Sequence, residues 1–402
     1  MLLFTPFKST YLFLLFVFNF QLISCGQNSK VVSKKTDQEN QIIKTGAERT
    51  QLYLNLLKGK NVAVVGNQTS VIQKIQTRSG TREVSSFSHL VDSLLLLDVS
   101  IKKVFAPEHG FRGKADAGEI VKNGFDTKTG LSIVSLYGKN KKPSAAQLSG
   151  IDVVVFDIQD VGARFYTYLS TLLLVMEAAA ESDVEVLVLD RPNPHGHHVE
   201  GPMLDPAFKS FVGWAPVPVI HGMTFGELAK MAVGEGWLEG DATPRLTVIK
   251  CGGYAHSDRV MLSIAPSPNL PTHISVELYP SLCFLEPTNV SIGRGTPTPF
   301  EIAGIPIGMI PNTPDGKDPL RFTPVSKPGA SPNPKHENVV CVGNDFKSKG
   351  EEWWMAGPSW DLSILETYAH SFRNDENCVT NEEIFTLQKL SIPNICNSYL
   401  VG

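Results

Sequence analysis

The chain has 402 residues, of which 42% are hydrophobic and 19% are charged, and these proportions exclude an intrinsically disordered protein. Its 6 cysteines are too few for a disulfide-built scaffold, and a formal net charge of −4 provides no basic field that would attract nucleic acid. The length suits two domains. The 33 glycines and 27 prolines slightly exceed the average share and predict many short, sharply turned loops.

The N-terminal residues predict an export signal. The apolar run 11–20 is too short for a comfortable membrane span but has the size of a signal-peptide core. Residues 22–26 resemble a bacterial lipobox, in which Cys25 is lipidated and becomes the new N-terminus. We therefore expect a signal peptide at 1–24, a polar tether at 25–42, and an exported lipoprotein held on a membrane of the cell envelope. The alternative is an ordinary secretory signal with an incidental cysteine.

The remaining five cysteines show no metal-binding or redox spacing. They stand at positions 251, 283, 341, 378 and 396, and no two form a Cys-x-x-Cys pair. This spacing gives no support to a zinc or thioredoxin-type site. We expect them to be buried thiols that pack as small hydrophobic side chains.

Short apolar runs alternate with helical patterns over residues 43–210. Helices are predicted at 47–57, 87–97 and 166–181, and strands at 61–66, 103–106, 151–156 and 184–189. Continuous apolar runs are typical of strands that are covered on both faces. The alternation therefore predicts an α/β fold, a Rossmann-like doubly wound sheet of mostly parallel strands.

The pattern of predicted elements and the composition of the sequence change near residue 211. A helix is predicted at 225–233 and a strand at 245–250, whereas 263–345 is rich in Pro, Gly and Asn and is expected to be irregular. We interpret 211–402 as a second, smaller α+β domain.

Each of the four predicted strands ends in a polar cluster. The clusters are Asn67-Gln68, Glu108-His109, Asp157 with Asp160, and Asp190-Arg191 with Asn193. Carboxyl ends of parallel strands meet along one edge, so these side chains are expected to form a functional rim there. Helix caps and turns explain Asp and Asn in one or two of these clusters, but not the accompanying Glu, His and Arg.

Several common chemistries lack their motifs. The sequence contains no Gly-x-Gly-x-x-Gly or Walker A motif, so neither a nucleotide nor another cofactor is expected. It also contains no Gly-x-Ser-x-Gly or His-Glu-x-x-His motif. His195, His197, His198 and His221 lie in loops rich in Pro and Gly and are interpreted as solvated or backbone-bonded, so no metal is expected.

Carboxylate chemistry remains, and it centres on Glu108. Pro107 restricts the backbone before Glu108, and Gly110 permits a sharp turn after it. Asp116 and Glu119 follow closely enough to share the loop. A carboxyl group partly removed from water beside other carboxylates has a raised pKa and can serve as a general acid. On spacing alone, a structural ion pair of Glu108 with Arg112 or Arg164 is equally acceptable.

Seven strings together resemble the hallmark strings of one family, in the same order. They lie at residues 105–113, 157–168, 189–194, 199–202, 221–224, 266–271 and 289–296. The chain is similar to the bacterial exo-β-N-acetylmuramidases, long catalogued as a domain of unknown function. The resemblance extends from about residue 45 to 330. Beyond about residue 371 the chain departs from the closing helical segment of that family, which suggests a truncated or atypical C-terminus.

The resemblance implies an active site in a cleft between a Rossmann-like domain and a smaller one. It also implies the release of terminal β-linked N-acetylmuramic acid from the non-reducing end of peptidoglycan fragments, with Glu108 as the catalytic glutamate. Residues in the matched strings or near them are implied to contact substrate or to support those that do. These residues are His109, Arg112, Asp116, Asp160, Arg164, Tyr168, Asn193, Asn269, Glu286 and Arg294.

The reaction needs a proton donor and support for an oxocarbenium-like centre. Glu108 is the expected donor. The support could come from a second carboxylate or from the 2-acetamido group of the substrate; the candidate carboxylates are Asp116, Glu119, Asp160 and Glu286. An arginine suits the lactyl carboxylate of muramic acid, and Arg112, Arg164 and Arg294 are the candidates. Two alternatives stay open: a lipid-anchored protein that binds cell-wall fragments without turnover, and a hydrolase of another amino sugar.

Overall fold

The computed structural model describes residues 43–78, 81–113, 123–240, 243–307, 319–357, 360–365 and 368. The predicted signal peptide, tether and Cys25 lie outside these ranges, as do Asp116, Glu119 and the C-terminal residues 369–402. Across the ranges described, no helix is both long enough and apolar enough to span a membrane.

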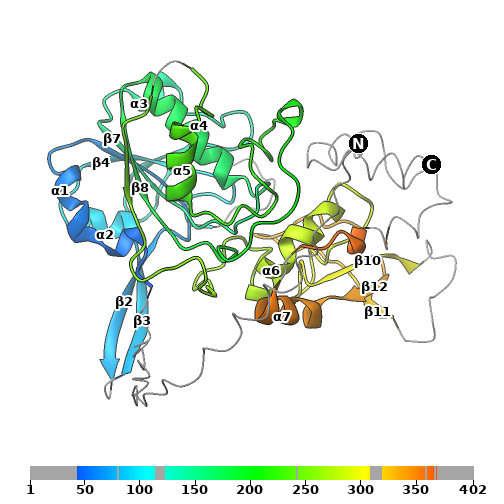
Figure 1. Cartoon of the computed structure of the whole chain (residues 1–402). Coiled ribbons are helices and arrows are strands. Elements are labelled where there is room, and N and C mark those ends of the chain that lie inside the picture. Colours follow the sequence, from blue (N-terminus) through cyan, green and yellow to red (C-terminus); the bar gives the residue numbers. More distant parts are fainter. Residues whose placement is uncertain are drawn as a thin grey trace, which may run out of the picture. The chain divides into compact units, whose positions relative to one another are not determined.

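A seven-stranded sheet forms the larger part of the fold (Figure 1). Its strands are β1 (Val62–Gly66), β4 (Ile101–Ala106), β5 (Gly124–Phe125), β6 (Ser132–Ser135), β7 (Val153–Asp157), β8 (Glu185–Leu189) and β9 (Leu246–Ile249). The order is β5-β6-β4-β1-β7-β8-β9, and every neighbouring pair is parallel except β5 with β6. Without β5 this is the doubly wound order 3-2-1-4-5-6, which confirms the predicted fold class.

The apolar strand sequences are explained by burial on both faces of the sheet. Within β1, Ala63 and Val65 belong to one buried cluster, whereas Val62 and Val64 belong to another on the opposite face. The other central strands alternate in the same way. Because both faces are covered, neither set of alternate positions can be polar, and the strands read as continuous hydrophobic runs.

Helices cover both faces. One cluster includes residues of α4 (Tyr168–Glu181) and α5 (Phe225–Gly234), and the other includes residues of α1 (Leu54–Leu57) and α2 (Leu90–Leu96). Short helices η1 (Gly46–Glu48), η2 (Thr50–Leu52), α3 (Ala145–Leu148) and η3 (Pro206–Phe208) complete this part. The predicted helix at 47–57 is therefore wrong as a single element, because the chain forms 3-10 turns before α1.

A β-hairpin of β2 (Val71–Arg78) and β3 (Thr81–His89) leaves the sheet beside α2 (Figure 1). The predicted helix at 87–97 is wrong over its first turn, because residues 87–89 end β3 and the helix begins only at Leu90. The His89 side chain caps α2 by accepting a hydrogen bond from the Val91 amide at 3.3 Å. The change from strand to helix therefore occurs at a single capping residue.

The sheet continues beyond the predicted domain boundary at residue 211. Strand β9 pairs with β8, and α5 packs beside both strands. The sheet therefore extends at least to Ile249, because a parallel neighbour of β8 requires a crossover and α5 supplies it.

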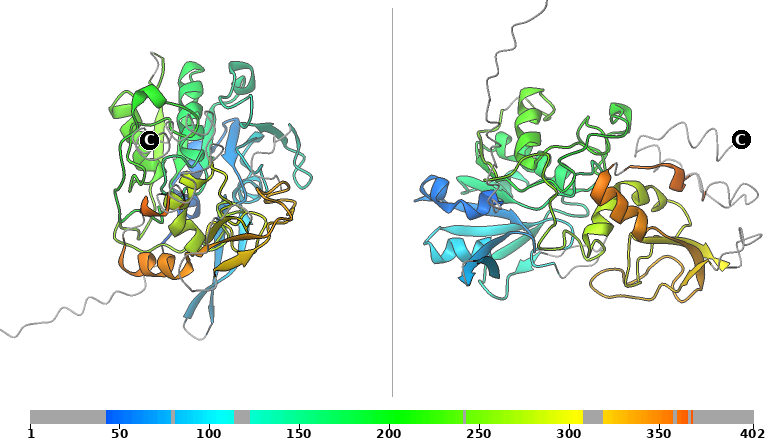
Figure 2. Two further views of the ribbon diagram at one scale, coloured as in Figure 1. Left: turned by 90° about the vertical axis from the view of Figure 1, so that its right-hand side faces the viewer. Right: turned by 60° about the horizontal axis from the view of Figure 1, so that its bottom comes forward.

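The smaller part is built on an antiparallel sheet of order β10-β12-β11. Its elements are α6 (His273–Leu282), η4 (Cys283–Leu285), β10 (Ile302–Pro306), β11 (Leu320–Phe322), β12 (Cys341–Asp345) and α7 (Lys347–Ala356). Helices α6 and α7 pack together (Figure 2). The segment 263–345, predicted to be irregular, thus contains a helix and three strands. Pro280 lies inside α6. Because proline is disfavoured in a helix interior, the sequence does not predict this helix.

Candidate active site

Glu108 lies at the carboxyl end of β4, on a tight backbone turn. The two residues after it, His109 and Gly110, have φ values of 67° and 76°. A left-handed conformation is unusual for a residue with a Cβ, so this turn carries conformational strain at His109. The Glu108 side chain is half-buried rather than solvated.

One hydroxyl group donates to the Glu108 carboxyl group: Thr167 Oγ1 lies 3.0 Å from Glu108 Oε2. Burial, followed by the Glu108 charge, raises the Tyr137 pKa above its ordinary value. The Tyr168 hydroxyl donates to the backbone carbonyl of Glu108 at 3.3 Å. Both the carboxyl and the backbone of Glu108 are therefore held by protein groups.

The segment 266–269 meets the turn of Glu108. His109 is buried, and its Nε2 lies 3.2 Å from Ser267 Oγ. The Tyr166 hydroxyl donates to the carbonyl of Pro266 at 3.0 Å. Asn269, a predicted substrate residue, donates from Nδ2 to the carbonyl of Ala330 at 2.7 Å. The Asn269 side chain therefore ties the segment before α6 to the loop at Ala330.

Glu286 and Arg294 form an ion pair near Tyr137. Arg294 Nε lies 3.0 Å from Glu286 Oε1, and the side chains are 27% and 32% exposed. The charges of both residues act on the Tyr137 hydroxyl, in addition to that of Glu108. All three charged side chains therefore influence the pKa of one tyrosine, although Glu286 and Arg294 follow η4 and Glu108 follows β4.

The other predicted arginines are engaged by protein groups. Arg112 makes hydrogen bonds of 2.7 Å with both Asp126 oxygens and one of 3.0 Å with Asp92. Arg164 is 1% exposed and donates to the carbonyls of Pro202 and Val217. Burial lowers the Arg164 pKa to about 10. These contacts tie loops together.

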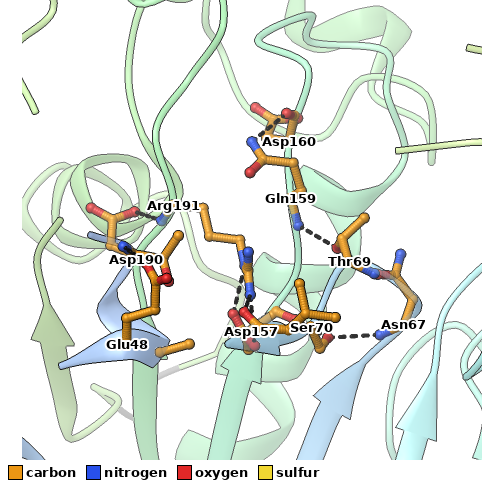
Figure 3. A network of polar contacts seen from close by, with 12 residues as sticks. Glu48, Asn67, Thr69, Ser70, Asp157, Gln159, Asp160, Asp190 and Arg191 are labelled. Carbon is orange, nitrogen blue, oxygen red and sulfur yellow. Dashed lines mark hydrogen bonds and ion pairs between the residues drawn. The ribbon is translucent and has the colours of Figure 1, made fainter. Parts of the chain in front are cut away.

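A network of polar contacts joins the ends of β1, β7 and β8 (Figure 3). Arg191 donates from Nε and Nη2 to the two oxygens of Asp157 at 2.6 and 3.0 Å. Ser70 Oγ donates to the Asp157 carbonyl, and the Gln159 amide donates to Thr69 Oγ1 at 3.0 Å. The predicted rim is therefore present. In this half of the rim, protein groups hydrogen-bond to one another.

Two buried histidine–carboxylate pairs lie behind the rim. His221 Nε2 is 3.2 Å from Asp160 Oδ2, and His195 Nε2 is 3.7 Å from Glu277 Oε2. His221 Nδ1 accepts a hydrogen bond from the Met223 backbone amide at 3.2 Å. The Asn193 amide bridges His195 and Met223 through backbone groups. In the part of the chain that is described, no three His, Cys, Asp or Glu side chains are grouped to hold a metal ion.

A cavity of about 160 Å³ opens beside the network of Figure 3. Thr69, Gln159 and Arg191 line it from the rim, and segment 259–264 lines it from the other side. Glu108 is not among its lining residues. The cavity therefore belongs to the β1–β7–β8 half of the rim, and the Glu108 cluster belongs to the β4–β6 half.

Tyr137 and Thr167 were not predicted as site residues, and the sequence carries a signal only for Thr167. Thr167 lies within the matched string 157–168, immediately before the predicted substrate residue Tyr168. Tyr137 follows β6, a short strand that the apolar pattern does not reveal. Of the six cysteines, Cys251, Cys283 and Cys341 are described and all three are free thiols.

Two family descriptions cover most of the described chain. Residues 62–274 match "Exo-beta-N-acetylmuramidase NamZ, N-terminal", and residues 277–356 match "Exo-beta-N-acetylmuramidase NamZ, C-terminal". The peptidoglycan beta-N-acetylmuramidase NamZ of Bacillus subtilis (strain 168) is 37% identical over 392 residues, which cover 91% of each chain.

Solved structures agree with these matches. A DUF1343 family protein from Bacteroides fragilis is 38% identical with a TM-score of 0.71, covering 86% of this chain and 88% of its own. A second DUF1343 family protein from the same organism is 28% identical with a TM-score of 0.66, covering 89% and 92%. Sequence and fold lead to the same assignment: the chain belongs to the exo-β-N-acetylmuramidase family.

Proposed function

We propose that this chain is an exo-acting glycosidase that releases terminal β-linked N-acetylmuramic acid from the non-reducing end of peptidoglycan fragments, with Glu108 as general acid and base. Membership of the family and the 37% identical NamZ relative support the glycosidase activity. The observation that carries the assignment of Glu108 is its position at the carboxyl end of β4, where Thr167 Oγ1 donates a hydrogen bond to its carboxyl group.

The chemistry follows from this placement. Cleavage of a glycosidic bond needs a proton on the leaving oxygen as charge develops on the sugar. A half-buried carboxyl group with fixed orientation delivers that proton more efficiently than a freely rotating one. When the departing sugar has left, the resulting carboxylate can accept a proton from the water that completes hydrolysis.

Among the three predicted arginines, Arg294 is best suited to the lactyl carboxylate. Its side chain is 27% exposed and uses Nε and one terminal nitrogen on Glu286, whereas Arg164 is 1% exposed and Arg112 bridges two aspartates. A guanidinium group has five N–H donors, so Arg294 can bind a second carboxylate beside Glu286. We therefore place the lactyl group of the substrate at Arg294.

Glu108→Gln tests the catalytic role. On a chromogenic β-N-acetylmuramide, the variant is expected to lose about 10²- to 10⁴-fold in kcat, because amide cannot deliver the proton. Binding of the muramide, measured by calorimetry, is expected to persist. The control Glu235→Gln removes an exposed carboxyl group at the end of α5 and should leave turnover unchanged. Unchanged turnover in Glu108→Gln would contradict the assignment, and wild-type binding without turnover would instead indicate a binding protein.

Substrate choice tests the lactyl site. The N-acetylglucosaminide lacks the lactyl group and should be cleaved poorly by the wild type. Arg294→Gln should raise KM for the muramide about 10- to 100-fold, because a charge-assisted contact is lost. It should leave the glucosaminide nearly unaffected. Equal wild-type rates on both glycosides would contradict the site and favour a hydrolase of broader amino-sugar specificity.

A further inference from the structure

The cavity beside the network of Figure 3 is walled by three parts of the chain. Thr69, Gln159 and Arg191 line it from the loops that follow β1, β7 and β8. Gln73 lines it from the base of the β2–β3 hairpin, and segment 259–264 lines the opposite side. A concave site with mostly apolar walls and a few polar groups is the usual form of a ligand site in proteins.

Two of the lining side chains keep hydrogen-bonding capacity for a ligand. Gln159 donates from Nε2 to the carbonyls of Asp160 and Pro192 at 2.9 and 2.8 Å, and no described residue donates to its Oε1. Arg191 uses Nε and Nη2 on Asp157, and no described residue accepts from its Nη1. The cavity therefore offers an amide acceptor and a guanidinium donor.

This combination favours a neutral ligand that both donates and accepts hydrogen bonds. A carboxylate or phosphate only accepts, so it would leave the Gln159 oxygen unmatched, and Asp157 already neutralises Arg191. Sugar hydroxyl groups and N-acetyl groups do both. The methyl of an acetamido group would also find apolar surface in the cavity, because Val71 and Leu262 are among the lining residues.

One segment of the chain joins this cavity to the turn of Glu108. Residues 259–264 line the cavity, and Ser267, three residues further on, contacts the turn that follows Glu108. The Gln68 side chain holds the intervening stretch by donating to the Pro266 carbonyl at 3.0 Å. In the sheet, β7 is two strands from β4, which corresponds to about 10 Å. The cavity is therefore a second position along the edge that carries Glu108.

We propose that this cavity is a subsite for an N-acetylated amino sugar on the leaving-group side of the substrate, beyond the sugar that is bonded to the released residue. The inference rests on the proposed function, because an exo-acting enzyme receives its chain in one direction only from Glu108. The terminal sugar and its glycosidic bond occupy the Glu108 end of the edge, so a sugar bound two strands away belongs to the remaining chain. The substrate class is thus a glycan longer than a disaccharide.

Chain length tests the subsite. The wild type is assayed on a disaccharide and a tetrasaccharide that carry muramic acid at the non-reducing end and no peptide. We expect kcat/KM to be about 10-fold higher for the tetrasaccharide, mainly through a lower KM, because one or two hydrogen bonds are added. Equal values would overturn the inference. So would a peptide-bearing disaccharide that reaches the tetrasaccharide value, since this result would indicate a peptide site.

Ser263→Trp fills the cavity from an exposed position on its edge. The ratio of the two kcat/KM values, tetrasaccharide over disaccharide, should fall from about 10 to about one. Ser257→Trp is the matched control, because Ser257 is exposed on the same stretch of chain but does not line the cavity. It should keep the wild-type ratio.

Gln73→Leu is a second variant, which removes a lining amide from the hairpin without adding bulk to segment 259–264. It should lower the ratio about 3-fold, because one hydrogen bond to the sugar is lost. This variant keeps the test valid if the tryptophan at position 263 disturbs the segment. An unchanged ratio in both Ser263→Trp and Gln73→Leu would overturn the inference.

The chromogenic muramide separates this inference from the proposed function. It has no second leaving sugar, so the wild type should cleave it whether or not the cavity binds a sugar. Absence of wild-type turnover on this glycoside would defeat the proposed function. Turnover without any effect of chain length would defeat the subsite alone.

Discussion

Glu108 depends on a backbone turn that few residue types adopt. Left-handed φ at His109 and Gly110 reverses the chain immediately after the carboxyl group, and the buried ring of His109 reaches Ser267. Pro107 and Gly110 predict a sharp turn from the sequence alone. The contact with Ser267 could not be predicted, because it joins residues 158 positions apart.

The residues of the candidate site also differ in whether the sequence alone predicts them. Glu108, Arg294 and Glu286 could be named from the sequence because their residue types and the matched strings point to carbohydrate chemistry. Tyr137 could not, since its place beyond the end of β6 depends on the register between β4 and β6. Arg112 is an equally good candidate by spacing, and only its two aspartate partners show that it supports the loop.

Asp190 is expected to make the free energy of unfolding depend on pH. This buried carboxyl group accepts hydrogen bonds from Thr224 Oγ1 at 2.7 Å and the Gly226 amide at 2.8 Å, yet burial is the larger effect and raises its pKa from 3.8 to about 6. A raised folded-state pKa gives stability that is complete below the unfolded value and is lost as pH rises through the folded value. The wild type should therefore lose about 3 kcal/mol from this group between about pH 4 and pH 6.

Asp190→Asn isolates this effect because the amide keeps the shape of the side chain without the charge. Urea unfolding of both proteins at several pH values should show the wild type losing stability relative to the variant as pH rises from 4 to 6.5. A difference between the two free energies of unfolding that stays constant across this interval would show that Asp190 does not titrate there.

At the level of elements, the central strands were predictable because burial on both faces forces apolar runs. The predicted strand at 61–66 is β1 at Val62–Gly66, and that at 184–189 is β8 at Glu185–Leu189. The hairpin β2–β3 was missed because its strands carry many polar residues and no continuous apolar run. Helix α6 was missed because Pro280 and the Pro-rich segment before it suggest a loop.

The small sheet requires a glycine at its centre. A Cβ on Gly343 of β12 would lie 1.9 Å from the Ala303 carbonyl oxygen of β10. Backbone cannot move away without separating the strands, so Gly343→Ala should lower the free energy of unfolding by about 1–3 kcal/mol. Thermal melts give the test. Gly234→Ala in α5 meets no atom within 4 Å and should be neutral or slightly stabilising; equal melting temperatures for both variants would refute the close approach.

At the level of the whole described molecule, the two sheets share one hydrophobic core. Phe165, which precedes α4, packs with Tyr279 of α6 and Phe284 of η4 at ring distances of 5.5 and 5.4 Å. The same buried cluster includes Val154 of β7 and Ile305 of β10. The length of the chain suggested two domains, and separate family models match 62–274 and 277–356; the two sheets nevertheless both contribute residues to one buried cluster.

Unfolding is therefore expected to be a single cooperative transition for residues 43–357. Pulse labelling of backbone amides across a urea series, with detection by mass spectrometry, should show β7 and β12 losing protection at the same midpoint. Loss of protection in β12 at a clearly lower urea concentration, while β7 stays protected, would indicate separate domains.

The contacts between the ends of β1 and β7 have a consequence for redesign. In doubly wound folds, the crevice between these central strands is where dinucleotides bind. Here Ser70 and Thr69 span it by hydrogen bonds to the backbone of Asp157 and Gln159. An engineer who wished to install a nucleotide on this scaffold would have to replace both side chains with glycine and rebuild the loop. Glu108, one strand away at the end of β4, could be left intact.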